Sequence, residues 1–119
     1  MAGTIVADTL THSTAGSIAT NYVVNGSAKV WVSHSDAGVN LTNFGISSIV
    51  DDGTGINTLN FSSAFSSTQF ITGGTCASGS DRNITASSPT TTSIVIETFN
   101  TAGSNVASTS SQAFHGDLA

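Results

Sequence analysis

Apolar and polar residues alternate in short runs along this chain, and the alternation predicts β-strands. Within residues 28–34, the apolar side chains of Ala28, Val30 and Val32 share one face of a predicted strand. Trp31 falls on the opposite, less apolar face. A large aromatic side chain in that position needs cover, either from a second sheet or from a neighbouring subunit.

The segment 44–61 predicts a β-hairpin. The first strand alternates at Phe44, Ile46, Ser48 and Val50, and the return strand alternates at Asn57, Leu59 and Phe61. The turn between them, residues 51–55, reads Asp-Asp-Gly-Thr-Gly. An Asp-Gly pair supplies the positive backbone dihedrals of a tight turn, and the second glycine fits a hairpin loop with a bulge.

Further strands are predicted on both sides of this hairpin. In chain order they cover residues 4–10, 22–24, 69–77, 83–85, 91–99 and 106–115. Residues 11–21 are small and polar, which predicts a loop or an extended arm, and Asn25-Gly26 is a turn signal. We expect an all-β fold, a single antiparallel β-sandwich or meander of about seven to nine short strands with an extended N-terminal arm. Residues 1–27 would form the N-terminal strand and arm, and residues 28–119 the sandwich domain.

The composition points to a protein that works by contact. Serine and threonine supply 38 of the 119 residues, and Lys29 and Arg82 are the only lysine and arginine against seven acidic residues. A net charge of -5 argues against binding to nucleic-acid phosphates or to an anionic membrane, so neither partner is expected. Such a composition also suits disorder, but the regular spacing of valine, isoleucine and phenylalanine favours a folded sheet. Because large apolar side chains are few, oligomerisation would supply some of the missing burial.

Several short motifs contain residue types used in catalysis or metal binding. His34-Ser35-Asp36 has the residues of a hydrolase triad, but side chains adjacent in sequence rarely meet in that geometry. Asp51-Asp52-Gly53 could suggest calcium, yet a hairpin turn explains it better. In a trimer, His34 or His115 near the three-fold axis could bind a transition metal, although a surface or interface histidine is the preferred interpretation. We therefore expect no enzyme, no catalytic residue, no cofactor and no metal ligand.

A family resemblance begins at residues 25–32, Asn-Gly-Ser-Ala-Lys-Val-Trp-Val. This run resembles the NGSAKAWV sequence at the start of a β-rich domain of tailed phages of marine bacteria, found in tail-fibre and other virion appendage proteins. Residues 44–55 are similar to the family's FNVSSITDNGTG hairpin, and residues 59–61 to its VNF return strand. Residues 97–103 and 113–116 are similar to the late strand and the closing segment. The resemblance spans most of the chain, and its specific motifs lie between residues 25 and 61.

Two positions depart from the family pattern. The family usually has an aromatic-containing NFNGTG segment after the tryptophan strand, where this chain has residues 33–38, Ser-His-Ser-Asp-Ala-Gly. Asn57 replaces the aromatic residue of the return strand. Both changes lie near loops, so they put surface binding in doubt more than the fold. The resemblance implies a homotrimeric structural component of the virion, made in the cytoplasm of the bacterial host.

Two locations on the particle are compatible with this expectation. In the first, the protein is a capsid decoration protein or head fibre that docks on the major capsid protein through residues 1–27. We expect this location because 119 residues leave no room for a fibre shaft or a separate attachment domain. In the second, it is a tail-fibre or receptor-binding subunit that contacts a tail protein and binds host-surface glycans or proteins. The residues expected at the interface are Ile5, Val6, Leu10, Tyr22, Val23 and Trp31.

Overall fold

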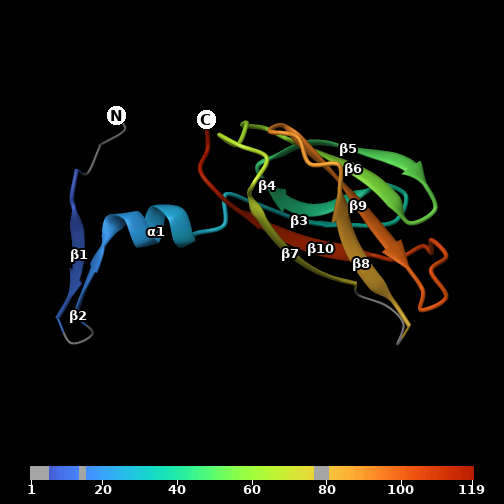
Figure 1. The fold of residues 1–119 in the computed structure, drawn as a ribbon, viewed down its shortest axis with the longest axis horizontal. Coiled ribbons are helices and arrows are strands. Elements are labelled where there is room, and N and C mark those ends of the chain that lie inside the picture. Colours follow the sequence, from blue (N-terminus) through green and yellow to red (C-terminus); the bar gives the residue numbers. More distant parts are fainter. Residues whose placement is uncertain (1–5, 14–15, 77–80) are drawn as a thin grey trace.

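The computed structural model describes residues 6–13, 16–76 and 81–119. Within these residues, ten strands form three antiparallel sheets of two, four and four strands, and one short helix, α1 (Thr20–Gly26), follows the first sheet (Figure 1). The fold is therefore all-β, and the expected antiparallel sandwich is confirmed.

The sandwich consists of the two four-stranded sheets. The first has the order β4 (Asn40–Phe44), β3 (Val30–His34), β10 (Ser110–His115) and β7 (Ile71–Cys76). The second has the order β5 (Ile46–Gly53), β6 (Ile56–Phe61), β9 (Ser93–Phe99) and β8 (Asn83–Ser87). The strands β7 and β8 thus form corresponding edges of the two sheets, and β4 and β5 form the other two edges.

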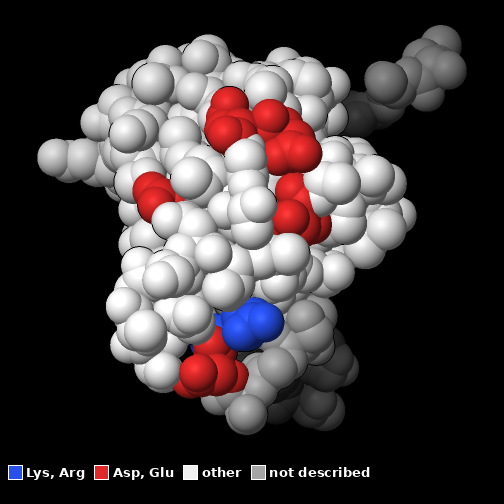
Figure 2. Space-filling view, turned by 90° about the vertical axis from the view of Figure 1, so that its right-hand side faces the viewer, with Lys and Arg blue, Asp and Glu red and all other residues white. Residues whose placement is uncertain are grey.

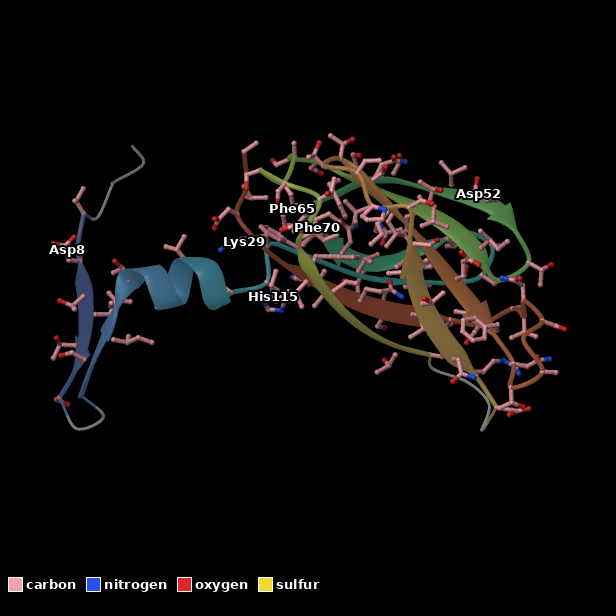
Figure 3. All side chains as sticks on the ribbon, in the orientation of Figure 1. Asp8, Lys29, Asp52, Phe65, Phe70 and His115 are labelled. Atoms are coloured by element: carbon pink, nitrogen blue, oxygen red, sulfur yellow. The ribbon has the colours of Figure 1, made fainter. Side chains whose placement is uncertain are left out.

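The core lies between the two sheets. Its fully buried apolar side chains come from both sheets and from one connecting segment; they are Val30, Val32, Leu59, Phe61, Phe65, Ile94, Ile96 and Phe114. The Phe61 ring contacts the Phe65 and Phe114 rings edge-on, with centroids 5.1 and 5.3 Å apart. Phe65 stacks on Phe70 at the end of the sandwich nearest to the helix (Figure 3). Aromatic pairs in these arrangements stabilise a core beyond the area that they bury.

The predicted hairpin is present as β5 and β6, with Thr54 and Gly55 at the turn. One face of β6 is buried as expected at Asn57, Leu59 and Phe61. The expected alternation of β5 is wrong, because the register shifts between Ile46 and Ser48 and the side chains after it change faces. As a result Ile49 packs against the core and Val50 is exposed.

The N-terminal segment also differs from the prediction. The segment 11–21, expected as a loop or an extended arm, contributes to a two-stranded sheet formed by β1 (Thr9–His12) and β2 (Gly16–Ala19). Residues 22–26, expected as a strand followed by a turn, belong to α1. Part of the first expected strand, residues 1–5, lies outside the described residues.

The helix α1 ends at a contact that a local sequence pattern does not reveal. The Lys29 ammonium group donates hydrogen bonds to the Val24 carbonyl and to the Ser27 hydroxyl, and the Ser27 N–H donates to the Val23 carbonyl at 3.2 Å. His115 Nδ1 donates to the Gly26 carbonyl at 3.2 Å. A cation beside the last carbonyls stabilises a helix C-terminus. His115 thereby links the C-terminal end of α1 to β10 of the sandwich, and Lys29 binds the last turn of the helix (Figure 3).

Candidate interaction surface

The outer face of the β4-β3-β10-β7 sheet carries large apolar side chains exposed to solvent. Trp31 is 41% exposed, Phe44 is 60% exposed and Ile71 is 73% exposed. Phe44, Trp31, Ala113 and Gly73 are register partners in a row across the four strands. No second sheet covers Trp31 among the described residues, so the cover that the sequence demands is missing from the single chain.

A shallow hollow lies beside Trp31 on this face. Its floor consists of small residues because Gly73 and Ala113 place no large side chain next to the indole. Its polar rim contains Ser33, Ser111 and Thr75, and the Ser111 hydroxyl donates to the Ser33 hydroxyl at 3.0 Å. A projecting aromatic side chain next to a small-residue hollow is a common arrangement at the centre of protein contacts. We call this surface the outer face.

The outer face is also free of charge. Its four strands contain no aspartate, glutamate, lysine or arginine. In contrast, the second sheet presents Asp52, which accepts a hydrogen bond from Thr58 at 2.6 Å, and Glu97, which accepts one from Ser87 at 2.8 Å. Acidic side chains gather at the end of the sandwich far from α1 (Figure 2). The centres of protein interfaces are likewise depleted of charged residues.

A second apolar surface lies on the N-terminal segment, which projects from the sandwich (Figure 1). We call β1, β2 and α1 together the arm. Val6, Leu10, Val23 and Val24 line one hollow of the arm and are all exposed, as is Ile18.

The residues expected at the interface fall on both surfaces. Val6, Leu10 and Val23 lie together on the arm, whereas Trp31 lies on the outer face of the sandwich. Tyr22 lies in α1, with its side chain outside the described part, and Ile5 lies outside the described residues.

Phe44 and Ile71 are exposed on the outer face but were not expected there. The glycine at position 45, with φ of 79°, separates β4 from β5 and is the sequence signal that assigns Phe44 to the earlier strand.

The histidine motif does not assemble a catalytic or metal centre. His34 is 1% exposed; its Nδ1 donates to the Ser35 carbonyl at 3.0 Å and its Nε2 lies 3.1 Å from the Ser110 hydroxyl. Asp36 instead accepts a hydrogen bond from the Gly55 N–H. The suggestion that His34 could reach a metal on a three-fold axis is therefore wrong, because its ring is buried and both nitrogens are engaged. No group of three potential ligands suited to a metal ion occurs in the part of the chain that the structure describes.

The chain matches no protein-family model, no curated protein and no solved structure. Within the described residues, no helix is long and apolar enough to cross a membrane.

Proposed function

We propose that this chain is a phage virion structural protein that assembles as a homotrimer on the outside of the capsid, as a decoration protein or head fibre. The observation that carries the proposal is the uncharged outer face, with Trp31, Phe44 and Ile71 exposed on it. Copies of a chain with a net charge of -5 repel one another overall, and a contact through the outer face brings no acidic side chains of its strands together. The phage resemblance of residues 25–61 supplies the virion context.

The arm supports a role in assembly. It carries a cluster of exposed apolar side chains on a segment outside the two sheets, and such a cluster is typical of a contact surface. In the proposal, the outer face and the arm provide the contacts with neighbouring copies and with the major capsid protein.

A tail-fibre or receptor-binding subunit is the second candidate. The hollow beside Trp31 favours it, because an indole ring next to the hydroxyls of Ser33, Ser111 and Thr75 offers an apolar surface with nearby polar groups for a host glycan. In this function the partner in the particle is a tail protein, and the same hollow stays open to solvent.

The position of the protein on the particle tests the proposal. We expect antibody labelling and electron microscopy of purified virions to place the protein over the capsid surface, with hundreds of copies per particle by quantitative mass spectrometry. Some tens of copies confined to the tail would support the second candidate. Absence from purified virions would contradict both.

Replacing Trp31 with aspartate should dissociate the homotrimer. The substitution places a carboxylate at the centre of the outer face, where burial against another copy removes it from water without a partner. We expect the Trp31→Asp variant to sediment as a monomer at a concentration where the native chain is trimeric. Val50→Asp is the matched control, since Val50 is exposed to a similar degree, 46%, but lies on the second sheet; it should stay trimeric. A trimeric Trp31→Asp variant would contradict a contact at the outer face.

A further inference from the structure

The four sheet edges of the sandwich are protected unequally against pairing with another chain. The β3–β4 ladder has a register shift at Ser33/His34, and the β5 edge has two register shifts and the carboxylates of Asp51 and Asp52. Bulges and charges of this kind block edge-to-edge pairing. The strands β7 and β8 contain no charged residue and no proline, and their ladders run without a shift. The unprotected edges therefore lie on one side of the sandwich.

A cavity of about 90 Å³ lies between these two edges. Ile84 and Ile96 form part of its apolar wall, and Gln112 lines it from β10. Gln112 is 5% exposed, and neither its Oε1 nor its Nε2 has a hydrogen-bond partner. A buried amide without partners is costly, so this side chain is suited to a polar group that arrives from outside the chain.

The glycine at position 74 directs Gln112 toward the β7 edge. A Cβ atom on Gly74 would lie 2.9 Å from the Ser111 carbonyl oxygen and 3.0 Å from Gln112 Cγ. The Gln112 side chain therefore packs against the Gly74 backbone, where any other residue would place its own side chain. Because β7 is an edge strand, the amide lies one strand away from whatever pairs with that edge.

The arm contains a hairpin that lacks a partner for its outer edges. The strands β1 and β2 pair with each other and with no other described strand, and an isolated two-stranded hairpin is marginally stable in water. Thr11 and Ser17 pair on one face, with their hydroxyl oxygens 2.9 Å apart. Leu10 and Ile18 pair on the opposite face and are exposed. The hairpin thus has a hydroxyl face and an apolar face.

We propose that the β1–β2 hairpin of one copy adds to the β7 edge of the next copy, with its hydroxyl face turned toward Gln112. Hydroxyl groups both donate and accept, so the hydroxyl on the hairpin strand next to β7, from Thr11 or Ser17, can donate to the amide oxygen or accept from the amide nitrogen. Leu10 and Ile18 then extend the apolar outer face beside Ile71. This pairing is a case of β-strand addition between copies of one chain.

This pairing assigns one contact within the proposed homotrimer, and it rests on that proposal. The hairpin and the β7 edge are different surfaces, so the contact is head-to-tail and closes only as a ring. Each copy offers the β1–β2 hairpin and the β7 edge, and a closed ring of three leaves neither of them unpaired.

Chemical cross-linking tests which edge receives the hairpin. In a full-length Cys76→Ser chain, Ile18→Cys and Gly73→Cys place thiols on the outer face of the hairpin and on the outer face of β7; a Cβ at Gly73 meets no atom within 4 Å. A short bis-maleimide reagent should give covalent dimers and trimers. The matched control is Ile18→Cys with Asn40→Cys on the β4 edge, which should give monomers. Equal cross-linking of both pairs, or none with Gly73→Cys, would overturn the proposal.

Replacing the Gln112 amide tests the strand addition independently of the homotrimer. Gln112→Met conserves volume and removes the group to be paired, so trimer association in the full chain should weaken about tenfold. Gln69→Met, at an exposed glutamine, should leave association unchanged. If Gln112→Met and the hairpin-breaking Ile18→Pro both leave a native trimer at unchanged affinity, the strand addition is wrong and the homotrimer stands. A native chain that is monomeric would overturn both.

Discussion

Replacing Gly55 with alanine should lower the free energy of unfolding by about 3 kcal/mol or more. Gly55 is buried at the β5–β6 turn with φ of 71°, in the left-handed region that disfavours other residues. A Cβ atom there would lie 2.6 Å from the Thr98 carbonyl oxygen and 2.7 Å from the Val106 carbonyl oxygen. Both oxygens belong to backbone, so relieving the clash requires the turn to move.

The same turn is fixed by hydrogen bonds that the movement would break. The Gly55 N–H donates to the Asp36 carboxylate at 2.5 Å, and the Gly55 carbonyl accepts from the Thr98 N–H at 2.8 Å. The Thr98 hydroxyl donates to the Val106 carbonyl at 2.6 Å. One substitution therefore disturbs the contacts of three segments.

Gly103→Ala is the matched control for Gly55→Ala. Gly103 has a similar φ of 81°, but a Cβ atom there meets nothing within 4 Å. The free energy of unfolding of the Gly103→Ala variant should fall only by the cost of the left-handed backbone conformation, about 1–2 kcal/mol. Denaturant unfolding at one fixed protein concentration measures both variants. Equal losses for the two would show that the close approach at Gly55 is unimportant.

Replacing Phe114 with alanine should cost about 3–5 kcal/mol of unfolding free energy. Phe114 is fully buried at the centre of the first sheet, and its ring contacts the Phe61 ring and the Phe70 ring, with centroids 5.3 and 6.1 Å away. The truncation removes a large apolar group and leaves a cavity that the two sheets cannot fully close. A lowered denaturant midpoint with an unchanged slope is the expected readout.

Phe44→Ala provides the comparison for Phe114→Ala. Phe44 is exposed on the outer face, so its truncation leaves no buried cavity in the single chain. We expect little change in the stability of the monomer and a weaker association of the proposed trimer. Comparing these two variants distinguishes the contribution of core packing to stability from the contribution of the outer face to association. A large loss of monomer stability in Phe44→Ala would contradict the assignment of Phe44 to a contact surface.

The alternation along the chain predicts those parts of the fold in which burial decides the conformation. Val30 and Val32 face the core and Trp31 faces outward, as the two-residue period of β3 requires. The β5–β6 hairpin forms as its glycine-containing loop predicts, but the chain turns at Thr54 and Gly55, and the Asp52-Gly53 pair lies at the end of β5. Alternation fails at Val50 because an irregularity between Ile46 and Ser48 reverses the faces, and the serines there suit either face.

Long-range contacts account for the remaining differences. The helix α1 depends on the Lys29 ammonium group and on His115, which is distant in sequence, so its own residues do not reveal it. For the candidate site, Trp31 is recognisable from its place on the polar face of a strand. Ile71 is not, since its exposure follows from the edge position of β7, which only the three-dimensional pairing defines.

In the proposed homotrimer, the uncharged outer face and the arm hold three copies of this chain together. The mass of the native chain in solution tests it most directly, by analytical ultracentrifugation or native mass spectrometry at micromolar concentration. We expect a species of three times the chain mass of 11.9 kDa. A single species of 11.9 kDa across that concentration range would contradict it.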